Sequence, residues 1–250
     1  MSNQSNRPPT ALERLDAEFS SIISKDSLSP LPAPRFISLL STGLDSPIAT
    51  FLMMRQGLDP ITLSFLNGQA QAGENQEKIL QIGQKLVELT GRRMIMLFVD
   101  YDRFLERFQH TSETRLTCIL CKRTMMDMAK TLAQRYQAKY IVNGDILGEQ
   151  ASQTLDNLFV VHQINREIPV VRPLIGFDKL DVIKLSQNIG LFELSLLKGP
   201  ACEFNPPFPE TRAKIDQVRK IEAEIDRAGL REEILSQITL KIIEPVTSKN

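Results

Sequence analysis

The sequence predicts an α/β fold in which helices cover both faces of a doubly wound, parallel sheet. Short apolar runs, such as residues 36–40 and 94–99, have the length of buried strands. Between them lie longer segments whose apolar residues recur at helical spacing, as in residues 74–90. Strands that alternate with helices in this way form parallel sheets with right-handed crossovers. We therefore expect a Rossmann-like domain.

The elements can be assigned in order along the chain. The expected strands cover residues 35–40, 61–66, 94–99, 140–143 and 170–174. The expected helices cover residues 10–23, 47–55, 74–90, 101–109, 116–137, 178–189 and 210–228, followed by a short helix and an apolar tail over 238–245. In the helix over 74–90, Leu89 is expected to face inward. Met125, Met126 and Met128 are expected to pack in the core.

Composition limits the location and the class of the protein. The chain has 250 residues, and its 30 Lys and Arg balance its 30 Asp and Glu, so no excess of basic residues marks a nucleic-acid-binding protein. No apolar run approaches the roughly 20 residues that span a membrane, and the polar first residues do not resemble a signal peptide. We expect a cytoplasmic protein that does not enter a membrane. An odd count of three cysteines argues against a disulfide framework and allows a metal or redox role.

A polar loop over residues 41–46 organises the chain. It follows the first expected strand and precedes a helix that starts at Pro47, where the missing N–H of proline costs nothing. Asp45 or Ser46 is expected to cap that helix. Free backbone N–H groups at the positive end of a helix dipole bind phosphate. The loop is not a Walker A motif, because no Gly-Lys-Ser/Thr follows.

Other polar segments are expected at the same edge of the sheet. They follow the remaining strands, and ligands of open parallel sheets bind at the carboxyl ends of the strands. The segments are residues 66–68, the loop after Val99, residues 143–145 and residues 174–176. One composite site is therefore expected.

Several motifs carry a resemblance to known enzymes. The hexad from Ser41 to Ser46 resembles the Ser-Gly-Gly-x-Asp-Ser signature of PP-loop ATP pyrophosphatases, with Thr42 in place of the first glycine. Residues 144–158, 172–179, 121–126, 209–213 and 220–224 resemble, in family order, segments of ThiI-type tRNA 4-thiouridine synthetases. The resemblance implies an adenine nucleotide alpha-hydrolase-like fold for a PP-loop domain over residues 35–230. Residues 1–34 are then an N-terminal extension with a proline-rich linker, and residues 231–250 a C-terminal tail.

The resemblance also implies residue roles. Asp45, Lys179 and Cys202 are the expected catalytic residues. ATP, with Mg²⁺ offsetting its charge, is expected to bind Leu39, Leu40, Ser41, Thr42, Gly43, Leu44, Asp45, Ser46, Phe65, Arg123, Gly144 and Gln153.

The cysteines leave several interpretations open. Cys118 and Cys121 have a common metal-ligand spacing, and Cys202 lies in a proline-rich segment. By analogy with cluster-dependent tRNA thiolation enzymes, the three would hold a 4Fe–4S cluster with one open iron. Zinc would need a fourth ligand, from His110 or His162. The remaining interpretations are a persulfide on Cys202 resolved by Cys121, and three unrelated buried thiols.

These features predict an ATP-dependent sulfurtransferase that adenylates a carbonyl oxygen, that of uridine in tRNA, and replaces it with sulfur. The expected partners are tRNA, a sulfur donor protein or sulfide, and a second copy of the chain in a homodimer. The family normally carries a THUMP domain that holds tRNA, and some members carry a rhodanese domain. Residues 1–34 are too few for either, so a separate RNA-binding partner is expected. The alternatives are delivery of sulfur or ammonia to a small molecule, and a non-enzymatic regulatory module.

Overall fold

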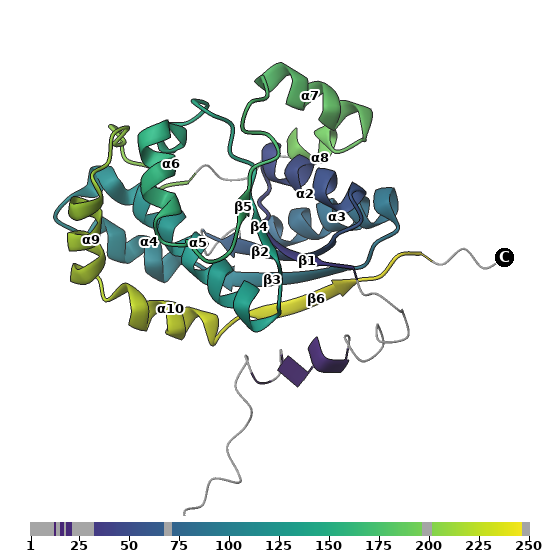
Figure 1. Ribbon diagram of the computed structural model, residues 1–250, viewed down its shortest axis with the longest axis horizontal. Helices are drawn as coiled ribbons and strands as arrows, with labels where there is room; N and C mark the ends of the chain where they lie inside the picture. Colours follow the sequence, from purple (N-terminus) through teal and green to yellow (C-terminus); the bar gives the residue numbers. More distant parts are fainter. Residues whose placement is uncertain are drawn as a thin grey trace, which may run out of the picture.

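The computed structural model describes residues 13, 16–17, 19–21, 33–67, 72–196 and 202–246. Its strands form one sheet in the order β5-β4-β1-β2-β3-β6 (Figure 1). The first five are parallel: β1 (Arg35–Leu39), β2 (Asp59–Leu66), β3 (Met94–Asp100), β4 (Tyr140–Val142) and β5 (Val170–Val171). The predicted doubly wound α/β fold is confirmed.

Alternation along the central strands builds a separate hydrophobic core on each face of the sheet. In β1, Phe36 packs on one face and Ile37 on the other, and in β3 Met96 and Leu97 divide in the same way. The Phe36 face is covered by α2 (Asp45–Arg55), α3 (Ala72–Thr90), α7 (Lys179–Asn188) and α8 (Phe192–Leu196). The Ile37 face is covered by α4 (Asp102–Gln109), α5 (Thr117–Arg135), α6 (Leu155–His162), α9 (Ile215–Glu224) and α10 (Arg227–Leu235).

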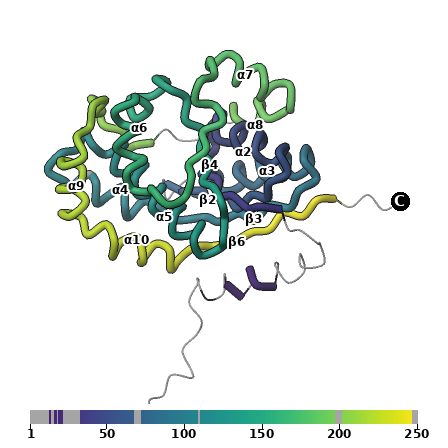
Figure 2. The backbone as a smooth tube through the Cα atoms, viewed as in Figure 1, coloured from purple at the N-terminus to yellow at the C-terminus, as the bar shows by residue number. Residues whose placement is uncertain are grey.

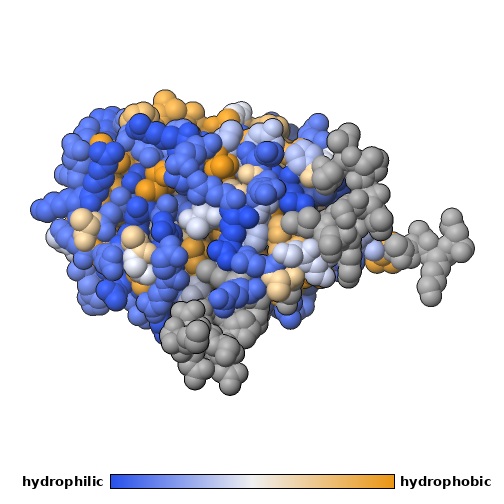
Figure 3. Space-filling model, turned by 60° about the horizontal axis from the view of Figure 1, so that its bottom comes forward, coloured by the Kyte–Doolittle hydropathy of each residue, from blue (hydrophilic) through white to orange (hydrophobic). Residues whose placement is uncertain are grey.

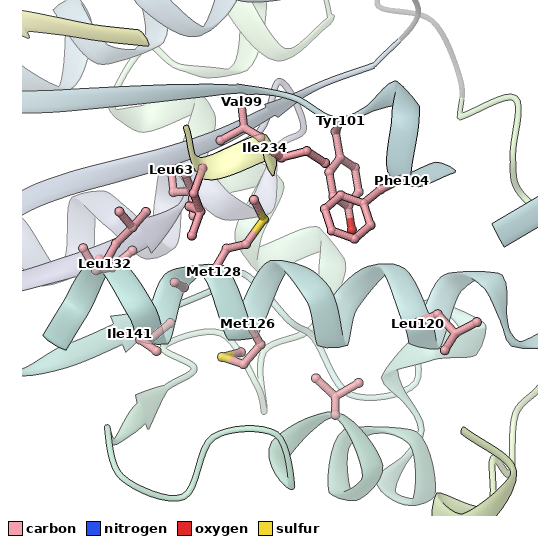
Figure 4. Close-up of a cluster of buried hydrophobic side chains, with 14 of the residues drawn as sticks. Leu63, Val99, Tyr101, Phe104, Leu120, Met126, Met128, Leu132, Ile141 and Ile234 are labelled. Atoms are coloured by element: carbon pink, nitrogen blue, oxygen red, sulfur yellow. The ribbon is translucent and has the colours of Figure 1, made fainter. Parts of the chain in front are cut away.

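Helix α5 is the central helix on the Ile37 face. Met128 and Leu132 point from α5 toward Leu63 of the sheet, while Met126 projects from another side of the helix (Figure 4). All four side chains are buried. The expected core packing of Met126 and Met128 is confirmed, whereas Met125 is only partly buried.

Leu89 does not face inward as expected. Its side chain is 39 % exposed, because the buried stripe in the last turns of α3 runs through Leu86 and Val87 instead. The prediction for Leu89 was therefore wrong.

The C-terminal part of the chain departs most from the prediction. The helix expected over 210–228 is α9, which ends at Glu224, and the short helix expected after it is α10, which begins earlier than expected, at Arg227. The two helices are separated at Asp226, whose φ is +44°. Asp226 starts α10 by accepting a hydrogen bond from the backbone N–H of Gly229. The expected apolar tail contains β6 (Thr239–Ile243), which pairs antiparallel with β3. Elements from the end of the chain thus lie beside earlier ones that are distant in sequence (Figure 2). Helices α9 and α10 contact α5, and β6 lies beside β3.

At the N-terminus, Phe19 is buried against Tyr136, with ring centroids 4.1 Å apart. Most of the helix expected over 10–23, and most of the linker, lies outside the described residues. In the part of the chain that the structure describes, no helix is both long and apolar enough to cross a membrane. Hydrophilic residues cover most of the described surface in the view of Figure 3.

Candidate active site

A cavity of about 250 Å³ opens where the winding of the sheet reverses. β1 lies between β2 and β4, so the chain leaves β1 toward one side of the sheet and returns to the other side with β4. Ligands of open α/β sheets bind at such a switch point. The cavity lies between the loop after β1 and the segment after β4, and its lining includes Ser41, Gly43, Ser46, Asn143 and Gly144.

The loop after β1 is held by its own hydroxyl groups. The backbone N–H of Ser41 donates to Oγ of Ser46 at 2.9 Å, and the two Oγ atoms lie 2.9 Å apart. The N–H of Gly43 donates to Ser41 Oγ at 3.3 Å. α2 begins at Asp45, with Leu44 at its N-cap position and no side-chain cap. The expected cap by Asp45 or Ser46 is thus wrong, because Ser46 turns back to Ser41. The helix N-terminus is left for an anion.

Gly144 lets the two sides of the cavity approach closely. A Cβ atom at this position would lie 2.6 Å from the backbone nitrogen of Ser46 and 2.7 Å from the carbonyl carbon of Asp45. Only glycine avoids this backbone clash. The segment after β4 therefore rests against the first turn of α2.

Lys179 connects α7 with the loop. Its Nζ donates to both carboxylate oxygens of Asp45, at 2.7 and 2.9 Å. The same ammonium lies 3.6 Å from a carboxylate oxygen of Glu149. The structure thus brings together two of the three predicted catalytic residues.

Asp145 is a buried carboxylate in the cavity wall. It was expected at this edge of the sheet only as part of the segment 143–145. It accepts hydrogen bonds from Lys122 at 2.8 Å, Arg172 at 3.3 Å and Gln153 at 3.2 Å. Burial raises the pKa of Asp145, but the two cations and these hydrogen bonds outweigh it and hold the pKa below its ordinary value. Asp145 therefore stays ionised and fixes Lys122 and Arg172 at the cavity.

Arg123 does not line this cavity. Its guanidinium is buried and forms a two-pronged ion pair with Glu222, at 2.8 and 2.9 Å, and it also donates to the carbonyl oxygen of Val160. Lys122, one residue earlier on α5, lines the cavity instead. Adjacent helical residues point about 100° apart, and this rotation directs Arg123 toward Glu222 and Val160 instead of the cavity.

Some of the other predicted nucleotide contacts line the first cavity, and the rest do not. Leu39, Ser41, Gly43, Asp45, Ser46, Gly144 and Gln153 line the cavity. Leu40 is buried beneath the loop, Thr42 and Leu44 are partly buried within it, and Phe65 packs edge-on against Tyr101 at 4.9 Å. The last four are not among the described lining residues.

A second cavity, of about 490 Å³, holds two of the cysteines. Cys118 and Cys202 line it together with Gln150, Ala151, Ser152, Asn205 and Pro209. Cys118 Sγ donates to Asn205 Oδ1 at 3.3 Å. We call this space the thiol cavity. Gln150 lines both cavities, so they adjoin there.

The third cysteine, Cys121, is partly buried, as is Cys118. Burial raises the pKa of the Cys121 thiol to about 12, and Cys202 is one of the nearby groups that adds to this rise. Cys202 also adds to the rise that burial causes in the pKa of Cys118, so the three sulfurs lie in one region. Yet no group of three or more His, Cys, Asp and Glu side chains in the described residues is arranged to hold a metal ion. As placed, the cysteines do not form a cluster site.

Comparison with known proteins gives the family. The family model described as "Thiamine biosynthesis protein (ThiI)" matches residues 33–226. The chain belongs to the ThiI family. It is 35 % identical over 189 residues to a "Probable tRNA sulfurtransferase" of Methanobrevibacter smithii, covering 74 % of this chain and 49 % of that protein. A protein of the same description from Thermococcus kodakarensis is 36 % identical over 191 residues, covering 75 % and 49 %.

A solved structure has the same fold. The crystal structure of a 4-thiouridine synthetase–RNA complex with bound ATP matches with a TM-score of 0.79 and 27 % identity, over 86 % of this chain and 57 % of that one. This ThiI-family chain therefore spans about half the length of the curated relatives it matches.

Sequence reasoning missed several residues of this ThiI-family site. They include Lys122, Met125 and Gln150, all of which line the first cavity. Asn143 and Asp145 also line it, as expected for the segment 143–145 that follows a strand at the carboxyl edge of the sheet. Lys122 and Gln150 carry no local signal, because the direction of α5 and of the turn before η2 (Ala151–Gln153) places them.

Proposed function

We propose that this chain supplies the ATP-dependent catalytic part of a tRNA sulfurtransferase that makes 4-thiouridine. One observation carries the proposal: a phosphate-type loop and a cavity with two cysteines adjoin at Gln150. Such a reaction needs ATP on one side of the acceptor and sulfur on the other. Membership of the ThiI family and the likeness to a 4-thiouridine synthetase support this substrate.

ATP is proposed to bind the first cavity. The N–H groups at the start of α2 would receive the phosphates, and Lys122 would add positive charge. Gln153 Oε1 is buried without a hydrogen-bond partner among the described residues, and a nucleotide would supply one. Mg²⁺ bound with the triphosphate would offset its charge.

Activation is proposed to occur at the uridine oxygen O4. As O4 forms a bond to the α-phosphorus, the bond to pyrophosphate breaks, and the N3 proton is lost to solvent. A hydrosulfide equivalent then bonds to C4 and the C–O bond breaks. AMP leaves with the former carbonyl oxygen, and 4-thiouridine remains. Asp45 and Lys179 position the loop beside the phosphates, since placement and charge carry most phosphoryl chemistry.

Sulfur is proposed to enter through the thiol cavity, where Cys202 is exposed and Cys118 partly buried. The predicted 4Fe–4S cluster would need all three cysteines as ligands, and their placement does not provide that arrangement. No step is therefore assigned to a cluster. The analogy is tested by iron and sulfide analysis of anaerobically purified protein: a cluster predicts iron in wild type and its loss in Cys118→Ala, whereas iron-free, active protein contradicts it.

The partners are proposed from the family. tRNA is the acceptor, held with the help of an RNA-binding partner or a second copy of the chain, because the net charge is zero. A sulfur donor protein or sulfide supplies the sulfur. This chemistry is consistent with a cytoplasmic location.

The proposal is tested by incubating the chain with ATP, Mg²⁺, sulfide and unmodified tRNA, followed by nucleoside analysis. 4-Thiouridine is expected with wild type and not with Ser46→Ala, which removes the hydroxyl that holds the loop. Gln84→Leu, on the exposed surface of α3, is the control and should retain the product. If wild type binds ATP but tRNA gives neither AMP nor thionucleoside, a small-molecule acceptor replaces this proposal.

A further inference from the structure

Gln150 occupies a fixed position between the two cavities. Gln150 lines both cavities. Its backbone carbonyl oxygen accepts a hydrogen bond from the backbone N–H of Gln153 at 2.8 Å. The N–H of Gly148 donates to the Gln153 carbonyl at 3.0 Å, which closes the turn around it. Among the described residues, the Gln150 carboxamide has no hydrogen-bond partner. A polar group on a fixed turn is thus presented to whatever lies between the cavities.

The opposite wall of the thiol cavity is also anchored. Arg115 Nε donates to the carbonyl of Phe208 at 3.2 Å, and the N–H of Glu210 donates to the Arg115 carbonyl at 3.0 Å. Asn157 Nδ2 donates to the Glu210 carbonyl at 2.8 Å. These contacts tie the segment that carries Asn205 and Pro209 to η1 (Thr114–Leu116), the short 3-10 turn just before α5, and to α6. The cavity is therefore a formed space of a size typical for small ligands.

We propose that the thiol cavity receives the acceptor base, and that the Gln150 carboxamide recognises its carbonyl–imide edge. This inference rests on the proposed function. The reacting carbonyl must meet the α-phosphate on one side and sulfur on the other, and Gln150 stands where the two cavities adjoin. The carboxamide offers one acceptor and two donors. It can accept from N3–H of uracil and donate to O2, which leaves O4 for reaction.

Phe208 fits the same ligand. Its side chain is 77 % exposed and precedes Pro209 in the cavity wall. An exposed aromatic ring beside a cavity gives an extruded base a surface on which to stack. An unpaired base that leaves its stack would reach the cavity past this ring.

The test compares tRNA-dependent AMP formation in wild type, Gln150→Leu and the nearly isosteric Gln150→Glu. Both variants should lower kcat/KM for tRNA by roughly tenfold or more, because one loses the polar edge and the other sets a carboxylate against the base O2. In Gln150→Leu, the Kd for ATP should change by a smaller factor than kcat/KM for tRNA, because Gln150 is uncharged and does not belong to the loop over residues 41–46 that receives the phosphates. Gln84→Leu, the matched control on α3, should change neither quantity.

The outcomes separate the two proposals. A wild-type chain that forms no AMP with tRNA overturns the proposed function. A wild type that forms AMP, with folded Gln150 variants whose kcat/KM for tRNA is unchanged, overturns the base-recognition inference alone. Phe208→Ala should raise the KM for tRNA and Phe208→Tyr should retain the wild-type value; equal values in all three contradict stacking.

Discussion

The ammonium of Lys179 contacts both carboxylate oxygens of Asp45, although 134 residues separate them in the chain. The pair joins the first residue of α7 to the first residue of α2, and Asp45 lines the first cavity. Lys179 is one-third exposed, so the ion pair adds at most about 1 kcal/mol to stability. Its main consequence is the position of the loop.

Lys179→Met should therefore impair reaction more than folding. We expect the rate of tRNA-dependent pyrophosphate release to fall by roughly tenfold or more, because a charge beside the phosphates is lost. Lys184→Met removes an exposed lysine of the same helix and is the control. Equal rates for both variants would contradict a role for the Lys179–Asp45 pair.

Gly144→Ala tests the close approach of the loop and the segment after β4. The added methyl group would meet the backbone of Ser46 at 2.6 Å, so the two segments must separate. We expect a loss of about 1–3 kcal/mol in the free energy of unfolding and weaker ATP binding. Gly73→Ala in α3, where a Cβ meets nothing within 4 Å, should instead stabilise by about 0.4–1 kcal/mol. Denaturant titration measures the free energy of unfolding, and calorimetry measures ATP affinity. A Gly144→Ala variant with unchanged stability and unchanged ATP affinity would refute the close approach of the two segments.

Lys122 and Arg123 should separate function from stability. Arg123→Gln leaves Glu222 with a weakened buried ion pair, and we expect a loss of about 3 kcal/mol in unfolding free energy. Its ATP affinity, measured where the variant is folded, should match wild type. Lys122→Gln should weaken ATP binding roughly fivefold or more, because it removes a cation from the cavity. The reverse pattern would show that Arg123 contacts ATP after all.

Asp145 should make stability depend on pH. Its folded-state pKa lies below the ordinary value of 3.8, so its ionised form contributes stability above that pH. This contribution is lost as pH falls through the folded-state pKa. Wild type should therefore exceed Asp145→Asn in unfolding free energy at neutral pH, and the difference should narrow below pH 3.8. If the difference in unfolding free energy between wild type and Asp145→Asn stayed constant across this pH range, the stabilisation by Asp145 would come from packing and not from its charge.

The fold could be predicted from local patterns because the parallel strands β1 to β4 are largely buried runs, each followed by a helix. Strand β6 could not be predicted in this way, because four of its five residues are not buried and its position depends on pairing with β3. The break at Asp226 was missed because nothing in a charged helical pattern marks a left-handed residue.

For the site, motif resemblance brought Ser41, Asp45, Gly144, Gln153 and Lys179 to one edge of the sheet, and the structure places them there. The resemblance indicated Arg123, and not Lys122, as a nucleotide contact, because a sequence motif does not say which of two adjacent helical residues faces a cavity. The distances that decide this are between α5 and α9, which sequence periodicity cannot measure.

In the proposed reaction, a uridine carbonyl oxygen attacks the α-phosphate of ATP. The decisive measurement uses tRNA that carries a heavy oxygen isotope at O4 of the acceptor uridine, incubated with the chain, ATP and sulfide. We expect the isotope to leave with AMP, in an amount equal to the 4-thiouridine formed. AMP without the isotope, or ADP and phosphate as the nucleotide products, would contradict it.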